Sequence, residues 1–478
     1  MPFKLVILWT DALIYLLVVV VALLVWHIRR QEHLMAPWRK VARSPSGMSA
    51  ATLLACFVAI GLADSVHFRP AIAVKDGRTV YAVEVLSLLD AAATSLRQRR
   101  EKTYSAPLAT HLYAKETLTL PDGREVRDFP RLRHGGAHLS DPDTELVPDL
   151  ARRALLGLAS GAVLWILLAA LLCAVLARRG TTDVDAMWHA VWRGETELPW
   201  RAMLATAAAI LAVATPLLVI AAHYHVFGTD KVGQDVFYQA LKSIRTGLVI
   251  GTLTTLVMLP FALALGVMAG YFKGWVDDAI QYLYTTLSSI PGVLLIAAAV
   301  LMMQVWIDTH PHLFDTVLAR ADMRLLFLCM ILGITSWTGL ARLLRGEALK
   351  LREMEYIQAA HAFAVPHFRI ITRHILPNVM HIVLIAIVMD FSGLVLAEAV
   401  LSYVGVGVDP STISFGTMIN SARLEMAREP MVWWSLAAAF GFMLLLVLSA
   451  NLFADAVRDA FDPRIRAAGG LRFAVQRA

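Results

Sequence analysis

Long apolar stretches separated by polar loops run along most of this chain. A helix needs about 20 mostly apolar residues to cross the hydrocarbon core of a bilayer, and nine stretches approach that length. They cover residues 5–26, 48–66, 154–176, 203–222, 246–272, 279–306, 325–344, 379–404 and 431–453. Because they are continuously apolar and do not alternate, they exclude a closed barrel, and helices must satisfy the backbone in lipid. The pattern predicts an all-α polytopic membrane protein with about nine transmembrane helices.

Composition and charge agree with a membrane location. Hydrophobic residues make up 58% of the 478 positions and charged residues 17%, which is unusual for a soluble protein. The formal net charge is +6, but the basic residues collect beside the ends of the apolar stretches and not in one run. That distribution favours membrane topology over nucleic-acid binding, so we expect no nucleic-acid partner.

Arginine and lysine also predict the orientation. Basic residues crowd the loops after the first and third stretches, which are therefore expected to be cytoplasmic. The N-terminus and residues 67–153 then lie outside, and residues 352–380 and the C-terminus lie in the cytoplasm. Membrane lipid is the expected surrounding, and the cell inner membrane is the expected location.

The outside segment 67–153 is long enough to form a small α+β cap. Residues 83–99 have a helical apolar rhythm, and residues 116–129 are typical of two short strands around a turn at Pro121-Asp122-Gly123. The scattered basic residues of this segment fit either a solvated face or a docking surface for a partner.

A polar, cationic segment at 352–380 interrupts the apolar pattern. Residues 354–363 are expected to form a helix that ends before Pro366, because proline lacks an N–H and biases the preceding residue away from helical dihedrals. A second helical piece is expected at 367–376, stopping before Pro377. Isoleucines 370, 371 and 375 would face inward. Taken alone, the segment could be an amphipathic surface helix with no partner.

Several short motifs occur in a fixed order from about Phe227 onward. They are FGTD at 227–230, GQDV at 233–236, GYF at 270–272, IPG at 290–292, ARLLRGE at 341–347, the loop at 352–380, AEA at 397–399 and RDAFDPR at 458–464. Together they resemble the permease subunits of ATP-binding-cassette importers, specifically the second permease of the dipeptide, oligopeptide and nickel group. The resemblance covers about the last half of the chain.

The resemblance implies that the loop at 352–380 is the coupling element that sits in a groove of an ATPase subunit. The positions implied are Glu355, Tyr356, Gln358, Ala359, Ala360, Ala364, Pro366, Leu376 and Pro377. Two of them depart from the family pattern, because Gln358 stands where glutamate is usual and Ala364 where glycine is usual. If the turn needs a positive φ at Ala364, alanine costs about 1 kcal/mol relative to glycine.

The resemblance also places Gly228, Thr229, Asp230 and Asp235 at the external mouth, near a docked binding protein. Local helix capping is the alternative for the two aspartates. Polar residues within apolar stretches are expensive in lipid and tend to face a bundle interior or a wet cavity. Asp390, Ser392 and Glu398 are therefore candidates for the pore lining, with buried interhelical pairs as the alternative.

The resulting hypothesis is a permease core at 201–465, preceded by two extra spans (1–66), the cap (67–153) and a third extra span with its loop (154–200), and followed by a tail (466–478). The implied partners are a second homologous permease, two ATPase subunits or domains and an extracytoplasmic solute-binding protein. No phosphate-binding glycine loop or metal-ligand spacing occurs, so we expect no cofactor, metal or catalytic residue in this chain. An ion-coupled transporter or channel, or a sensory role for the first 200 residues, remains an alternative.

Overall fold

The structure is a computed structural model that describes residues 3–75, 78–119, 125–180, 183–314 and 316–461. The chain divides into two compact units. Among the described residues, unit 1 lies within 3–6, 39–246 and 413–449, and unit 2 lies within 7–38, 247–412 and 450–461. The predicted helical fold is confirmed, and eight helices in the described ranges are long and apolar enough to cross a membrane. Their bounds are α1 (Trp9–Arg29), α3 (Pro45–Ser65), α6 (Pro142–Gly180), α8 (Trp200–Ala221), α9 (Val236–Phe272), α11 (Gly292–Thr309), α16 (Leu376–Val404) with its N-terminal extension, and α18 (Trp434–Phe461).

Two of the nine predicted stretches are divided. The stretch at 279–306 is split into α10 (Gly274–Ser289) and α11, because Ile290, which precedes Pro291, has extended dihedrals. The stretch at 325–344 lies across α12 (Val317–Ser336) and α13 (Thr338–Arg352), which only Trp337 separates. Three charged residues near the start of α12 explain why it lacks the composition of a span, and α13, with 15 residues, is too short to be one.

Unit 1 contains the predicted α+β cap, whose main sheet is antiparallel. Strand β2 (His67–Lys75) pairs with β1 (Phe3–Val6), β3 (Arg78–Tyr81) and β4 (Leu86–Ser87). The helical pattern expected at 83–99 is confirmed in part: β4 comes first, followed by two short helices, α4 (Leu88–Ala92) and α5 (Thr94–Gln98). The start of α4 is fixed by a capping box between Ser87 and Asp90.

The expected strand pair at 116–129 is confirmed as β5 (Glu116–Thr119) and β6 (Glu125–Asp128), paired antiparallel. Its predicted turn at 121–123 lies outside the described residues.

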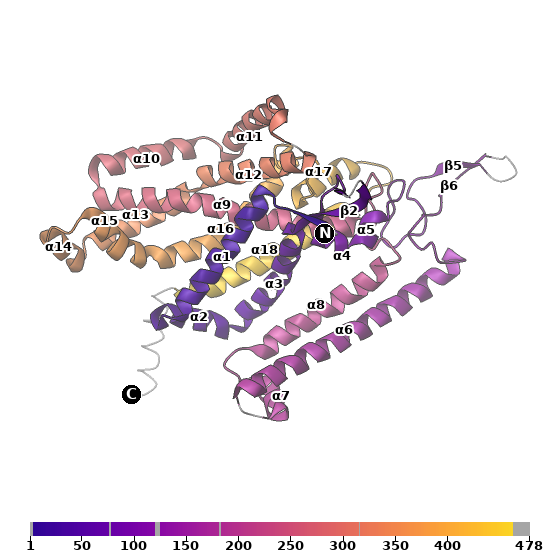
Figure 1. Cartoon of the computed structure of the whole chain (residues 1–478), viewed down its shortest axis with the longest axis horizontal. Coiled ribbons are helices and arrows are strands. Elements are labelled where there is room, and N and C mark those ends of the chain that lie inside the picture. Colours follow the sequence, from indigo (N-terminus) through magenta and orange to yellow (C-terminus); the bar gives the residue numbers. More distant parts are fainter. Residues whose placement is uncertain (1–2, 76–77, 120–124, 181–182, 315, 462–478) are drawn as a thin grey trace. The chain divides into compact units, whose positions relative to one another are not determined.

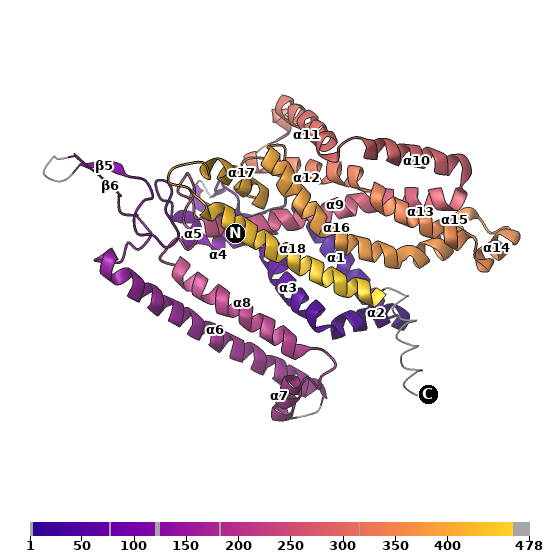
Figure 2. The ribbon, with the colours of Figure 1, turned by 180° about the vertical axis from the view of Figure 1, so that it is seen from behind.

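Helices α6 and α8 of unit 1 lie side by side, with the short helix α7 (Val184–Arg193) near one end of the pair (Figures 1 and 2). Small residues allow the two backbones to approach closely, since a Cβ at Gly157 would collide with the backbone of Pro216. The indole N–H of Trp165 donates to the carbonyl oxygen of Leu204 at 2.8 Å. Buried Ala169 and Cys173 of α6 form a cluster with Leu204 of α8 and Val191 of α7.

Unit 2 contains most of the segment that resembles the importer permeases. Its largest core joins α9, α13 and α16, and it extends to α14 (Glu355–Ala362) and α15 (His367–Ile370). A second core joins α9, α11 and α12. An ion pair connects α10 to α13, where Arg345 donates to both oxygens of Asp277 at 2.6 and 2.7 Å. The hydrogen bonds from Arg345 hold the pKa of the Asp277 carboxyl below its usual range.

Candidate functional site: coupling loop, mouth segment and pore cavity

The polar loop at 352–380 forms two short helices joined by a tight turn. The first predicted helix is confirmed as α14, whose last residue is Ala362. Ala364 then takes a left-handed conformation with φ of 54°. The N–H of Val365 donates to the carbonyl of Ala360 at 3.0 Å, and the N–H of Ala364 donates to that of His361 at 2.9 Å. This is the Schellman pattern that usually uses glycine at the left-handed position, so the alanine carries backbone strain.

The second predicted helix does not stop before Pro377. Helix α15 continues through a π-helical turn at Ile371–Ile375 directly into α16, and Pro377 lies in the first turn of α16. A proline ring normally clashes with the carbonyl four residues earlier, and that carbonyl, of Arg373, lies in the widened π turn. The side-chain amide of Asn378 donates to the neighbouring carbonyl of His374 at 2.6 Å. The expected end at Leu376 is therefore wrong, because the π turn accommodates the proline.

Buried isoleucines hold the loop against the rest of unit 2. Ile357, Ile370 and Ile375 are fully buried, which confirms the inward direction predicted for the last two, and Ile371 is half-buried. The hydroxyl of Tyr271 lies 2.7 Å from Nδ1 of His367, which ties the end of α9 to the start of α15.

Further contacts fix the orientation of α14. Nζ of Lys273 donates to Glu353 at 2.7 Å, and this ion pair lowers the pKa of the Glu353 carboxyl. The amide of Asn378 donates to the hydroxyl of Tyr356 at 3.2 Å. The side chain of Gln358 donates to the carbonyl of Glu353 at 3.2 Å, a local bond that glutamate at this position could not donate. The loop is thus braced at both ends.

The opposite face of the loop is exposed and partly aromatic. Phe363 is 83% exposed and Phe368 is 78% exposed, and Met354 at the start of α14 is 50% exposed. Sequence reasoning missed both phenylalanines, although two large aromatic side chains in a polar loop are the available signal. Of the positions expected to contact an ATPase, Glu355, Tyr356, Gln358, Ala359, Ala364, Pro366 and Pro377 are exposed, and Ala360 and Leu376 are half-buried.

The mouth segment at 227–236 is packed against the cap within unit 1. The hydroxyl of Thr229 accepts a hydrogen bond from the Ser105 N–H at 2.7 Å, and the indole N–H of Trp434 donates to the Thr229 carbonyl at 3.0 Å. Gly228 has φ of 68°, and a Cβ there would collide with the Ser105 carbonyl. Glycine is therefore required at Gly228 by both conformation and space.

The two aspartates of the mouth segment cap local structure. One oxygen of Asp235 accepts the N–H groups of Phe237 and Tyr238 at the start of α9, and the side chain is only 1% exposed. Asp230 accepts the N–H groups of Val232 and Gln234 and is half-buried. The capping alternative thus describes both residues, and Asp235 has no surface left to meet a binding protein.

A buried charge cluster lies behind Asp235. Nδ1 of His225 lies 2.7 Å from Asp235, and its Nε2 lies 3.4 Å from Glu101 without hydrogen-bond geometry. Burial alone would lower the pKa of His225, but the two carboxylates outweigh it and raise the pKa to about 9. Burial raises the pKa of Glu101, yet contact with His225 and three backbone N–H groups lower it to about 2. Sequence reasoning missed Glu101, because nothing local distinguishes it.

The three pore candidates on α16 have different surroundings. Glu398 is 1% exposed and accepts a hydrogen bond from Ser402 at 2.6 Å. Ser392 is buried and donates to the carbonyl of Met389 at 3.1 Å. Asp390 is half-buried and lines a cavity in unit 2. The structure therefore separates Asp390 from Glu398, although their spacing of eight residues suggested one face.

Comparison with known proteins places the chain in a family. Residues 262–467 match the binding-protein-dependent transport system inner membrane component family. An oligopeptide transport system permease protein of Mycobacterium tuberculosis is 30% identical over 242 residues, which are 51% of this chain and 77% of that protein. This chain belongs to that permease family. A glutathione transport system permease protein of Pectobacterium atrosepticum is 32% identical over 51% of this permease and 73% of its own length.

One more relative and one solved structure are similar to part of this chain. A dipeptide transport system permease protein of Bacillus subtilis is 28% identical over 51% of this permease and 69% of that protein. An inward-facing structure of the MetNI methionine ABC transporter aligns with 46% of this permease and 93% of that chain, at 16% identity and a TM-score of 0.33. The family match includes the polar loop at 352–380 and the lining residues of the Asp390 cavity except Met258, whereas the cap and the mouth segment precede it. The protein is a multi-pass membrane permease.

Proposed function

We propose that this permease is the transmembrane subunit of an ATP-driven importer for peptides or similar small solutes. It forms half of the translocation pore together with a second homologous permease. Two ATPase subunits or domains drive it and hydrolyse the ATP, and an extracytoplasmic binding protein delivers the solute. Support for peptides comes from the relatives, which are named as oligopeptide, dipeptide and glutathione transport permeases.

The observation that carries the proposal is the two-sided coupling loop. Its inner face is anchored by Ile357, Ile370 and Ile375, and its outer face presents Phe363 and Phe368. Exposed aromatic side chains on a braced support are typical anchors of a protein interface. Closure of an ATPase dimer would move α14, and the continuous path from α15 into α16 would carry that motion into the membrane.

The proposed orientation places the coupling loop in the cytoplasm and the cap outside. Strand β1 pairs with β2 in the cap sheet, which supports an N-terminus on the same side as the cap. An odd number of crossings then brings the end of α18 to the cytoplasm. We assign the additional crossing to α12 and α13 acting together, since they connect the loop after α11 to the coupling loop.

The test is ATP-dependent uptake in proteoliposomes that contain the permease pair, the ATPase and the binding protein. Replacing both Phe363 and Phe368 with alanine should weaken ATPase binding at least about 30-fold, since truncating one interface anchor costs about 2 kcal/mol. Peptide uptake should fall with it. Phe129→Ala, which removes an exposed aromatic side chain from the cap, is the matched control and should leave ATPase binding unchanged. Full uptake without any ATPase, driven by an ion gradient, would refute the proposal and favour a secondary transporter.

A further inference from the structure

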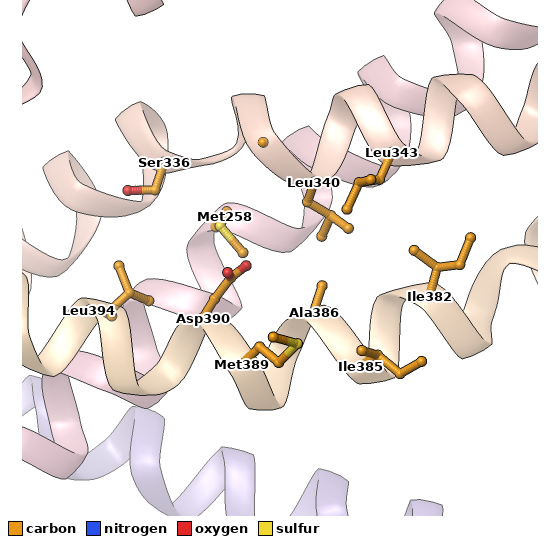
Figure 3. A pocket seen from close by; sticks show the side chains of 12 residues that line it. Met258, Ser336, Leu340, Leu343, Ile382, Ile385, Ala386, Met389, Asp390 and Leu394 are labelled. Carbon is orange, nitrogen blue, oxygen red and sulfur yellow. The ribbon is translucent and has the colours of Figure 1, made fainter. Parts of the chain in front are cut away.

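A cavity of about 530 Å³ lies within unit 2, between α16 and the helices α9, α12 and α13. Its wall is almost entirely apolar and includes Leu340, Ile382, Ala386 and two methionines, Met258 and Met389. Figure 3 shows the carboxylate of Asp390 reaching from α16 toward Met258. Pockets of a few hundred cubic ångströms with one placed polar group are typical of small-molecule sites.

Asp390 has no partner for its charge in the part of the chain that the structure describes. No hydrogen bond or ion pair joins its carboxylate to another described residue, whereas Glu398 on the same helix is hydrogen-bonded by Ser402. A carboxylate in an apolar wall at membrane depth is costly unless a cation or a proton neutralises it. Because the Asp390 side chain lines the cavity, a molecule bound in the cavity can supply the neutralising group.

The shape and chemistry of the cavity select the type of cation. A single carboxylate among apolar side chains lacks the oxygen ligands that a metal ion requires. A single carboxylate balances the charge of an ammonium group. The apolar groups of the same ligand are then free to contact the wall of the cavity. Methionine side chains are flexible and polarisable, so Met258 and Met389 can adapt to apolar groups of different shapes.

We propose that this cavity binds the protonated amino group of the transported solute, with Asp390 as the counter-ion and the apolar wall as the contact for the adjacent side chain. The inference rests on the proposed function, because it takes the solute to pass through this unit. It adds a site of selection within the membrane, after delivery by the binding protein.

Direct binding tests the site without relying on transport. The permease complex in nanodiscs, with the binding protein omitted, is titrated with leucyl-glycine and with N-acetyl-leucyl-glycine, which lacks the charge on its amino end. The unmutated complex should bind the free amine at least about tenfold more tightly, the ratio expected for a hydrogen-bonded ion pair. Asp390→Asn should abolish that preference, and Asp390→Glu should retain most of it.

Two further variants separate this role from a structural one. Asp278→Asn removes an exposed carboxylate of α10 in the same unit and should leave the ratio unchanged. Ala386→Phe fills part of the cavity and should weaken both ligands without changing their ratio, so it tests the site even if Asp390→Asn does not fold. An unchanged preference in Asp390→Asn, an equal loss of both ligands in that variant, or no binding to the unmutated complex would each overturn the inference. Amine-selective binding without ATP-driven uptake would instead uphold this site and refute the proposed function.

Discussion

Ala364, which has a left-handed backbone conformation just after α14, allows a sharp test of backbone strain in the proposed coupling loop. Ala364 has φ of 54°, which costs a residue with a Cβ about 1 kcal/mol, and glycine avoids this cost. Glycine also has more freedom in the unfolded chain, which removes part of the gain. Ala364→Gly should therefore stabilise the turn by about 0.7 kcal/mol, equivalent to about threefold in the local opening equilibrium.

A matched control substitution should change the local opening equilibrium in the opposite direction. Ala359 is exposed and lies inside α14, so Ala359→Gly makes the same chemical change in ordinary helical dihedrals. Glycine costs about 1 kcal/mol relative to alanine in a helix interior, so this variant should open about fivefold more often. The two substitutions thus differ in backbone conformation and not in the atoms removed.

Amide hydrogen exchange of the complete permease reports on both variants. The N–H groups of Ala364 and Val365 are bonded to the last turn of α14, and their exchange follows local opening. Exchange should slow about threefold in Ala364→Gly and quicken about fivefold in Ala359→Gly. If both variants quicken exchange to the same extent, the positive φ is not a source of strain and the reasoning fails.

Two further predictions concern unit 1. Glu101 has a lowered pKa of about 2, so its contribution to cap stability is complete above about pH 4.5 and is lost as the pH falls toward 2. His225 has a raised pKa of about 9, so its contribution is complete below about pH 6.5 and is lost as the pH rises through 9. Thermal unfolding should thus show greatest cap stability between about pH 4.5 and 6.5, and Glu101→Gln should flatten the acid side of that profile; an unaltered acid side would contradict the assignment. Nζ of Lys242 contacts Asp90 at 2.8 Å and Asp64 at 3.0 Å, so Lys242→Met should destabilise unit 1 by about 3 kcal/mol in denaturant unfolding, and Lys242→Arg by clearly less. Equal losses in the two variants would show that packing, and not charge, holds α9 there.

Local patterns predicted much of the fold. Apolar length identified the helices that are candidates for crossing the membrane, and alternation with a turn signal identified β5 and β6. Strand β1 was not predictable in this way, because it lies more than 60 residues before its partner β2 and merges with the apolar run of α1. The end assigned at Leu376 failed for a related reason, since a proline rule does not include a π turn that makes room for the ring.

The candidate site was predictable to a similar degree. The position of the polar loop and the inward direction of Ile370 and Ile375 follow from the sequence pattern, whereas the coupling role proposed for the loop came from the family resemblance. The separation of Asp390 from Glu398 does not, because eight residues of an ideal helix leave both near one face, and only the surrounding helices decide which side chain meets a cavity. Glu101 and Asp235 both contact His225, which lies more than 120 residues after Glu101 in the sequence. Only the folded chain therefore reveals the cluster.

The packing of Gly233 against the cap bears on how this chain can be divided. A Cβ at Gly233 would collide with the carbonyl of Glu101, and the N–H of Glu101 donates to the carbonyl of Gly233 at 2.9 Å. Cutting the chain before α8 would therefore remove backbone partners of the mouth segment. The remaining C-terminal part of the chain cannot replace these partners. A loss of uptake after such a truncation would report damage to the remaining half as much as the removal of a separate module. Point substitutions within the first 200 residues, and not deletions, are the means to ask what they contribute.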